Sequence, residues 1–410
     1  MLNQPENEPR RELQSYSFKI SNLLYYFGLI LLFSSSFFQT SLLPSTFNIV
    51  ALLIVAIKYS GITLLVLSFL IRRDIPMRFI AMFVLSFSIS VIVSLMSGSP
   101  EIAFFTMVFF ASYNMDGIKI LKITFFCGMI VILAVFVLQN QGYLIDLIYY
   151  RGAVERHSFG FTYPTDLAAH FSYLVILYVG FRRQNFSYLE LVGVCVVAWY
   201  VMTYFDARLD GAIILLTGIS AQVLAHKRLQ SSKLVSSSIS KLAMLIMPLL
   251  AFLSTIMTLL WRCYPDKLGT LNTLLSNRLA MSSEGFSRYN VPLFGQRVSM
   301  SGFGGLDGYT LNREVYGYFM IDISYIRVLL MLGVLGVGLV TFYFVLTCKQ
   351  FKHRQNNYYA LCFILVAIHS FVAQFLLSIS YDMIFAVGLS VFSTISYQVR
   401  MADESTEDKF

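Results

Sequence analysis

The chain alternates between long apolar stretches and short polar connections along nearly its whole length. An apolar helix needs about 20 residues to cross a bilayer, and most of these stretches approach that length. We therefore predict an all-α, polytopic membrane protein with about twelve transmembrane helices. The predicted spans cover residues 20–39, 48–71, 79–97, 101–113, 120–139, 166–181, 187–205, 210–225, 240–260, 321–346, 357–376 and 382–397.

The polar connections give no sign of a second domain, so residues 1–410 are interpreted as one membrane domain. Two connections stand out by their polar content, a loop at 139–165 and a large loop at 261–320. The large loop is rich in aromatic residues, which argues against disorder. Four leucines in it recur at helical spacing, which predicts an amphipathic helix resting on the membrane surface. These are Leu271, Leu274, Leu275 and Leu279.

Composition agrees with a membrane protein. Hydrophobic residues make up 57% of the chain and charged residues 13%, about half the ~25% that is usual for soluble proteins. Of the five cysteines only Cys263 lies in a polar segment, which excludes a disulfide scaffold. No Cys/His metal spacing and no Asp-x-Asp motif occurs, so we expect neither a metal nor another cofactor.

The distribution of basic residues predicts the orientation. Nineteen of the 30 Lys and Arg residues fall in one alternate set of loops, which the positive-inside rule assigns to the cytoplasm together with both termini. The first residues are interpreted as a cytoplasmic tail before an uncleaved first span. The net charge of +8 follows from this bias, and nucleic-acid binding is not expected.

The opposite face holds ten basic residues, counting Arg327 near the outer end of the tenth predicted span, and nine of them are arginines. Arginine presents a planar fork of donors that matches phosphate, and the aromatic residues nearby suit the apolar faces of sugar rings. These loops therefore suggest a cleft for a phosphate-bearing glycan. Alternatively, the arginines anchor to lipid headgroups or pair with neighbouring acids. These acids are Asp146, Glu155, Asp206 and Asp210.

Several short motifs carry a resemblance to a known family. Leu275-Ser-Asn-Arg278-Leu279, Leu293-Phe-Gly-Gln296 and Asp322-Ile-Ser-Tyr325 follow one another around the large loop. They resemble the Leu-Ser-x-Arg-Leu, Leu-Phe-Gly-Gln and Asp-x-x-Tyr elements of Wzy-type polymerases. These bacterial enzymes join lipid-linked oligosaccharide repeat units into O-antigen or capsule.

Two further elements extend the resemblance into other loops. Arg156-His157-Ser-Phe-Gly-Phe161 with Pro164 is similar to an element of that family in which an arginine precedes Gly-Phe and a proline. Arg208 follows a small residue, as is usual there. The chain departs from the family at Tyr163-Pro164-Thr165, where His-Pro-Asn is common, so a contact made by that Asn is in doubt.

The resemblance implies an enzyme of the bacterial plasma (inner) membrane that works on the extracytoplasmic face. It would transfer the growing glycan from its polyprenyl diphosphate to the non-reducing end of an incoming unit. The implied partners are the polyprenyl-diphosphate-linked oligosaccharide, membrane lipids, a flippase and a chain-length regulator. Two alternatives stay open, an O-antigen ligase and a lipid-linked oligosaccharide flippase or other transporter. Transporters place polar residues near mid-membrane, whereas here they concentrate in the outer loops.

The candidate catalytic residues are Arg156, His157, Arg278 and Asp322, and the candidate substrate-binding residues are Arg151, Arg208, Arg288, Gln296 and Tyr325. The arginines would stabilise charge on the departing diphosphate, and His157 or Asp322 would act as general base. The simpler alternatives are that His157 only donates a hydrogen bond and that Gln296 serves a tight turn.

Three further expectations concern helix faces. Asp322 and Tyr325 would share one face of the span entrance. Asp166 and His170, four residues apart, would form a pair on their helix. His369 would be a hydrogen-bonded residue inside the bundle.

Overall fold

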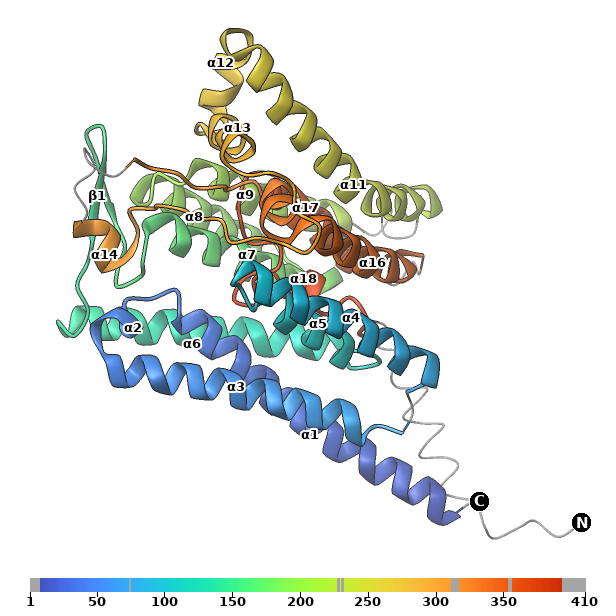
Figure 1. Ribbon diagram of the computed structural model, residues 1–410. Coiled ribbons are helices and arrows are strands. Elements are labelled where there is room, and N and C mark those ends of the chain that lie inside the picture. The colour runs from blue at the N-terminus through green and yellow to red at the C-terminus, as the bar shows by residue number, and fades with distance from the viewer. Residues whose placement is uncertain are drawn as a thin grey trace, which may run out of the picture.

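The computed structural model describes residues 8–73, 75–226, 229, 232–310, 317–352 and 356–392, with side chains from Ser17 onward. Within them the fold is mostly helical (Figure 1). The longer helices are α1 (Glu8–Phe38), α3 (Asn48–Ile71), α4 (Met77–Ser97), α5 (Glu101–Ala111), α6 (Gly117–Asn140), α7 (Pro164–Arg182), α8 (Tyr188–Tyr204), α9 (Arg208–Ala225), α11 (Lys233–Cys263), α16 (Gly333–Phe351) and α17 (Asn357–Ser370).

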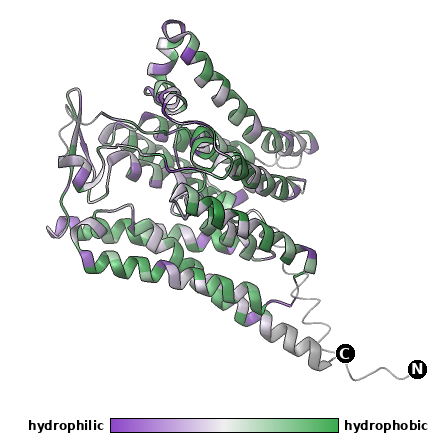
Figure 2. Ribbon diagram, in the orientation of Figure 1, coloured by the Kyte–Doolittle hydropathy of each residue, from purple (hydrophilic) through white to green (hydrophobic). Residues whose placement is uncertain are grey.

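Seven segments in the described chain are long and apolar enough to cross a bilayer. They are Ser17–Phe38, Asn48–Ile71, Met77–Ser97, Gly117–Asn140, Arg208–Ala225, Lys233–Cys263 and Ser324–Phe351. Large apolar side chains such as Leu52 and Met77 are exposed on these helices, as lipid-facing side chains would be. Hydrophobic residues run along the helices, while hydrophilic ones gather at helix ends and connections (Figure 2). The prediction of an all-α membrane protein is confirmed; the count of twelve spans stays a prediction.

Helices α7 and α17 form the centre of the bundle. Both are buried along most of their length, and α7 packs against α6, α9 and α17. Around them α1 packs on α3 and α6, and α8 packs on α9. The polar residues of α7 therefore lie inside the protein and need partners there, which Asp166 and His170 find in Thr162 and Thr40.

The short elements gather at one end of the bundle, which we call the hairpin end. It holds α2 (Leu43–Thr46), the antiparallel strands β1 (Ile148–Arg151) and β2 (Val154–His157), and α14 (Gly305–Thr310), as Figure 1 shows. A β-bridge between Ser41 and Phe161 ties two of its loops together. Several of the loops predicted to be extracytoplasmic from their lower Lys and Arg content therefore lie close together in space.

The β1–β2 hairpin is not predicted by the apolar pattern. Gly152 has a φ of +62° at its turn, a conformation that tight hairpin turns need. Tyr149 and Arg156, which are paired across the strands, are buried, whereas Tyr150 and Glu155 face outward and hydrogen-bond each other at 2.8 Å. The hairpin thereby carries Arg156 into the protein interior.

The four leucines of the large loop do not share one helix: Leu271 and Leu274 lie on α12, Leu275 caps its end, and Leu279 lies on α13. Helix α12 (Pro265–Leu274) ends before Ser276 and Asn277, which have positive φ, and α13 (Arg278–Arg288) begins directly after them. Asn272 fastens the break, because its side chain donates to Asn277 Oδ1 at 3.0 Å and accepts from the backbone N–H of Ala280 at 3.1 Å. The break makes Arg278 the first residue of a helix.

The predicted twelfth span, 382–397, is wrong as a continuous helix in its described part. Only α18 (Met383–Ala386) is helical there, and most of segment 371–392 forms turns and irregular backbone; residues 393–397 lie outside the described residues. Irregular backbone is tolerated at membrane depth where protein surrounds it. Most of the segment is buried inside the bundle and the rest of it is half-buried, so an apolar composition did not require a helix.

A π-helical turn, η3 (Val328–Leu332), joins α15 (Ser324–Arg327) to α16. The backbone N–H and the side-chain amide of Gln296 donate to the carbonyls of Met331 at 2.9 Å and Leu330 at 3.0 Å. Gly333 follows the turn with a φ of +71°, and a Cβ there would lie 2.5 Å from the carbonyl oxygen of Pro292. The Leu-Phe-Gly-Gln element thus stabilises this π-helical turn through Gln296.

Gly333→Ala is expected to destabilise the protein by about 1–3 kcal/mol, because alanine at this positive φ is strained and its methyl group would meet backbone. Thermal unfolding of the purified protein in detergent measures the loss. Gly338→Ala in the same helix is the matched control, since a Cβ there meets nothing within 4 Å, and it should not lower the unfolding temperature. Equal unfolding temperatures for both variants would contradict the prediction.

Candidate active site

A polar cavity of about 130 Å³ lies at the hairpin end, between the N-termini of α7, α9 and α13. Loop residues 302–304 and 318–322 and the irregular segment 373–375 complete its walls. The cavity has room for several waters or a small polar group. The lining residues that carry its chemistry are Tyr163, Asp166, Asp210, Arg278, Tyr318, Asp322 and Gln374.

Arg278 and Asp322, two of the predicted catalytic residues, meet in this cavity. Arg278 Nε lies 3.5 Å from Asp322 Oδ2, and the side chains are 19% and 26% exposed. Burial raises the pKa of Asp322, and the charges of Arg278 and then Arg327 offset part of that rise. Arg278 Nη1 is buried without a hydrogen-bond partner among the described residues. The guanidinium therefore keeps a donor for a ligand oxygen.

Two further carboxylates, Asp166 and Asp210, line the same cavity. Each lies in the first turn of a helix, where the helix dipole favours negative charge. Thr162 Oγ1 donates to Asp166 at 2.9 Å, and His369 Nε2 lies 2.9 Å from Asp210 Oδ1. With three aspartates and one arginine in its lining the cavity is acidic, whereas the sequence suggested a cleft dominated by arginines.

The expected pair of Asp166 with His170 is not formed. His170 Nε2 instead makes a 2.7 Å hydrogen bond with Thr40 Oγ1. Its ring is stacked between Phe37, at a centroid distance of 3.7 Å, and Tyr381, at 4.0 Å. The rings that pack on the imidazole thus orient it towards Thr40 instead of Asp166. The Asp166 side chain lines the cavity instead.

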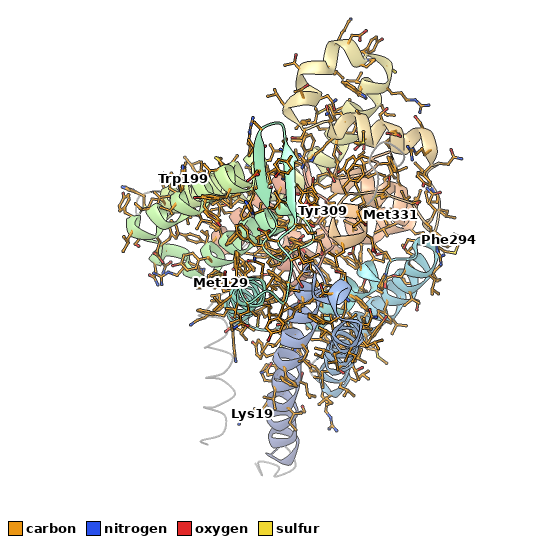
Figure 3. All side chains as sticks on the ribbon, turned by 90° about the vertical axis from the view of Figure 1, so that its left-hand side faces the viewer. Lys19, Met129, Trp199, Phe294, Tyr309 and Met331 are labelled. Carbon is orange, nitrogen blue, oxygen red and sulfur yellow. The ribbon has the colours of Figure 1, made fainter. Side chains whose placement is uncertain are left out.

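Tyrosine rings form the side of the cavity nearest the hairpin. Tyr163 packs edge-on against Tyr149 at a centroid distance of 4.5 Å, and Tyr149 against Tyr309 at 5.3 Å. Tyr309 lies near the centre when the molecule is viewed onto this end, with Trp199 towards the periphery (Figure 3). Burial raises the pKa of Tyr318, another lining residue, so its hydroxyl stays neutral and can donate. Such rings offer apolar faces and polar edges at once.

Three predicted arginines gather around Asp206 instead of the cavity, a group we call the Asp206 cluster. Arg151 Nη1 lies 3.2 Å and Arg208 Nε 3.1 Å from the two carboxylate oxygens of Asp206. Both arginine side chains remain largely exposed, at 50% and 82%. The alternative that arginines pair with neighbouring acids therefore holds for these two.

Arg156 is the buried member of the Asp206 cluster. Its Nε donates to the carbonyl of Phe205 at 2.6 Å, and its Cζ lies 5.5 Å from the centroid of Tyr163, which lines the cavity. Burial, and next the charge of Arg151, lowers the pKa of Arg156. Its Nη2 is buried without a hydrogen-bond partner among the described residues. Tyr163 thus lies between the arginine cluster and the acidic cavity.

Two other predicted residues lie outside the cavity lining. His157 Nδ1 makes a 2.6 Å contact with Asp146 Oδ2 on the hairpin. Arg288 pairs with Glu284 on its own helix and places its Cζ 4.3 Å from the ring centroid of Phe319. His157 therefore has a hydrogen-bonded acid as partner, and Arg288 is engaged locally.

Asp322 and Tyr325 do not share a face. Asp322 precedes α15, which begins at Ser324, so helical spacing does not apply to it. The Tyr325 hydroxyl donates to the carbonyl of Ala367 at 2.8 Å, and its ring lines a separate apolar cavity. The prediction that both side chains point to one site is wrong for Tyr325.

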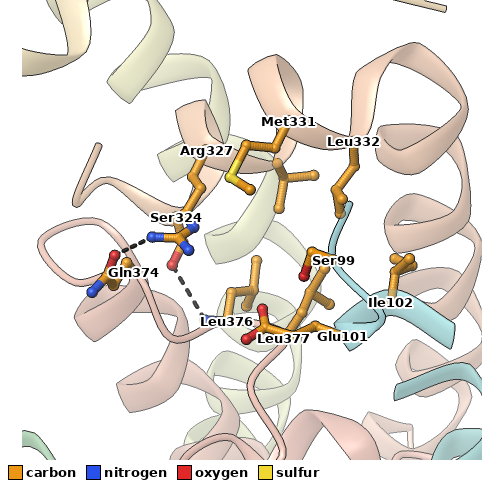
Figure 4. A pocket seen from close by; sticks show the side chains of 11 residues that line it. Ser99, Glu101, Ile102, Ser324, Arg327, Met331, Leu332, Gln374, Leu376 and Leu377 are labelled. Carbon is orange, nitrogen blue, oxygen red and sulfur yellow. Dashed lines mark hydrogen bonds between the residues drawn. The ribbon is translucent and has the colours of Figure 1, made fainter. Parts of the chain in front are cut away.

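A second cavity of about 30 Å³ shares Gln374 with the first (Figure 4). Arg327 donates to the side-chain Oε1 of Gln374, and Ser324 Oγ accepts from the N–H of Leu376 at 3.2 Å. These bonds hold the irregular segment 373–377 against the start of the tenth predicted span. They fix the amide of Gln374 at the cavity wall.

Sequence reasoning missed several cavity residues. Tyr318 and Gln374 come from irregular backbone that carries no periodic signal, and the Tyr163 position was noted only as a departure from the family. Asp210 was considered only as a partner for arginines. Its place two residues after Arg208, at a helix start, was the available signal.

Comparison of the chain with protein-family models, curated proteins and solved structures gives no match. Among the described residues no group of three or more His, Cys, Asp or Glu side chains is placed to hold a metal ion.

Arg156→Lys is expected to loosen the hairpin, because a lysine cannot both reach the Phe205 carbonyl and lie over Tyr163. Losing this buried donor should lower the free energy of unfolding by about 1–3 kcal/mol. It should also speed the exchange of the backbone amide hydrogens of residues 148–157. The matched control is Arg208→Lys, because the Arg208 side chain is 82% exposed. The free energy of unfolding of this variant should stay within about 0.5 kcal/mol of the native value. Unchanged exchange in Arg156→Lys would contradict this role.

Proposed function

We propose that the protein polymerises polyprenyl-diphosphate-linked oligosaccharide repeat units, as a Wzy-type O-antigen or capsule polymerase does. One observation carries the proposal: Arg278 and Asp322 meet in a tyrosine-lined cavity, and one of those tyrosines, Tyr163, contacts the buried Arg156. A base, a cation and sugar-binding rings are the parts that glycosyl transfer from a diphosphate needs. They lie at one end of a bundle of apolar helices, where a lipid-linked substrate would present its headgroup.

In the proposed reaction a hydroxyl oxygen of the acceptor sugar attacks the anomeric carbon of the growing glycan. The bond between that carbon and the diphosphate oxygen breaks, and the diphosphate leaves with the electron pair. Asp322 takes the proton of the attacking hydroxyl. Arg278 stabilises the negative charge that develops on the leaving oxygen, and its burial strengthens this interaction.

The charge distribution suggests where each substrate part binds. The acidic cavity suits sugar hydroxyls, which donate to carboxylates, and would repel a diphosphate. The Asp206 cluster, with three guanidinium groups and one carboxylate, has the positive excess that a diphosphate prefers. We therefore place the donor diphosphate between Arg278 and the Asp206 cluster and the acceptor sugar among the aspartates.

The predicted orientation places this site outside the cytoplasm, with both termini inside. The proposed location is the plasma (inner) membrane of a bacterium, where a flippase would deliver repeat units to the outer leaflet. A chain-length regulator is a further proposed partner. No ATP is present on that side, so the energy must come from the diphosphate linkage of the donor.

Two alternative functions use parts of the same structure. An O-antigen ligase would use the same cation and base but transfer a finished glycan to a lipid A core. A lipid-linked oligosaccharide transporter is favoured by one observation, the buried irregular segment 371–392. It carries Asp382, whose Oδ2 is buried without a hydrogen-bond partner among the described residues, and transporters build sites from broken helices.

Deletion of the gene in its host separates these functions. A polymerase deletion should leave a single repeat unit on the surface acceptor, a ligase deletion should leave lipid-linked polymer unattached, and a transporter deletion should trap repeat units on the inner leaflet. Complementation with Arg278→Ala should restore no long chains although the protein reaches the membrane. Arg262→Ala, an exposed arginine outside the cavity lining, is the control and should restore the native ladder. Native chain lengths with Arg278→Ala would refute its role.

The rate of polymerisation should fall with acidification at a pH above the usual aspartate range near 4. Asp322 must be ionised to act as a base, and burial raises its pKa, so its proton returns at a higher pH than usual. A pH profile in proteoliposomes measures this. Asp322→Asn should lose about 10²- to 10⁴-fold in rate, whereas Asp307→Asn, at an exposed carboxylate, should keep the native profile. An active Asp322→Asn variant would exclude it as the base.

A further inference from the structure

A histidine deep in the bundle contacts one carboxylate of the cavity. Asp210 lines the cavity and is 12% exposed, and its Oδ1 lies 2.9 Å from Nε2 of His369, which is 1% exposed. His369 Nδ1 is buried without a hydrogen-bond partner among the described residues. Among the residues that the structure describes, Asp210 is therefore the only side chain that hydrogen-bonds the imidazole. The other side of the Asp210 carboxylate faces the cavity.

The two residues meet where two helices end. Asp210 lies in the first turn of α9, and His369 lies in the last turn of α17. A helix N-terminus favours negative charge and a helix C-terminus favours positive charge, so both dipoles stabilise a hydrogen bond from the imidazole to a carboxylate. The ring of Tyr173 packs edge-on against His369 at 4.9 Å, and Phe375, which lines the cavity, lies 6.5 Å away. These rings fix the orientation of the imidazole.

The three aspartates of the cavity consequently differ in the side chain that contacts their carboxylate. Asp322 has the charge of Arg278 beside it, and Asp166 accepts from the hydroxyl of Thr162. Asp210 is held by a buried ring that packing keeps in place. A carboxylate fixed in this way presents a fixed acceptor to its ligand, which lowers the entropy lost on binding.

We propose that His369 is a positioning residue that holds Asp210 as the hydrogen-bond acceptor for a hydroxyl group of the acceptor sugar. The inference rests on the proposed function and assigns the acceptor subsite within it. A hydroxyl donor fits this position because an ionised carboxylate only accepts hydrogen bonds. A diphosphate does not fit beside Asp210, because Asp166 and Asp322 line the same cavity and would repel it there. Asp210 contacts the substrate, and His369 acts through Asp210.

The test uses the full-length protein in proteoliposomes supplied with lipid-linked repeat units extracted from the deletion host. His369→Leu removes the donor to Asp210, whereas His369→Gln keeps an N–H near the position of Nε2. Asp210→Asn removes the charge of the acceptor itself. His226→Leu, an exposed histidine at the end of α9, is the control. The readouts are KM for the repeat unit, kcat and the unfolding temperature.

We expect His369→Leu and Asp210→Asn each to raise KM about tenfold, as loss of one hydrogen bond to a charged group would, and kcat to fall less than KM rises. His369→Gln should return KM to within about threefold of the native value. The KM of the variant that combines His369→Leu with Asp210→Asn should exceed that of either single variant by no more than about twofold, because the two side chains act as one unit. If His369 had only a structural role, His369→Leu would lower the unfolding temperature without raising KM more than it lowers kcat.

Two results overturn the inference alone. One is a native KM in His369→Leu or in Asp210→Asn while the native protein polymerises; the other is a KM in His369→Gln as high as in His369→Leu. If His369→Leu does not fold, Asp210→Asn and His369→Gln decide the matter, and native KM in Asp210→Asn overturns it. A native protein that makes no polymer from repeat units overturns the proposed function, and the inference with it.

Discussion

Charged side chains inside an apolar bundle must be matched by an opposite charge, a hydrogen bond or a helix terminus, and the candidate site depends on how this protein meets that constraint. An unpaired buried charge costs several kcal/mol. Arg278 and Asp322 lie beside each other, Asp166 and Asp210 lie in first turns of helices, and Asp210 also contacts His369. The same contacts that make burial tolerable place three carboxylates around one cavity.

The convergence of helix N-termini follows from the packing of the bundle. Helices α7 and α9 begin at the hairpin end and pack on each other, so their first turns are neighbours. The break at Asn277 then starts α13 beside them and brings Arg278 in as its first residue. The hairpin supplies Arg156 from the other side, with Tyr163 between it and the cavity. Four separate parts of the chain thereby contribute charged groups to one region.

Irregular backbone is concentrated where these parts meet. The segment 371–392 runs through the bundle with only α18 helical, and the π-helical turn η3 interrupts the entrance to α16. Continuous helices would present one face at fixed spacing and could not direct Asp322, Gln374 and Phe375 into one cavity. The cost of this backbone is met by specific bonds, such as those from Gln296 to the η3 carbonyls and from Ser324 to Ala373.

The sequence by itself determined the membrane class and most helix positions, and it predicted Arg278 and Asp322 as site residues that the structure brings together, because apolar length and local motifs are properties of contiguous residues. It predicted the basic cluster only in part: Arg151, Arg156 and Arg208 do assemble, but around Asp206 rather than in the acidic cavity. Which histidine pairs with which aspartate, why Tyr325 points away from Asp322, and where the last segment leaves helical geometry were decided by tertiary packing. Those outcomes depend on neighbours that are distant in sequence, such as Thr40 for His170 and Asp210 for His369, and no local pattern encodes them.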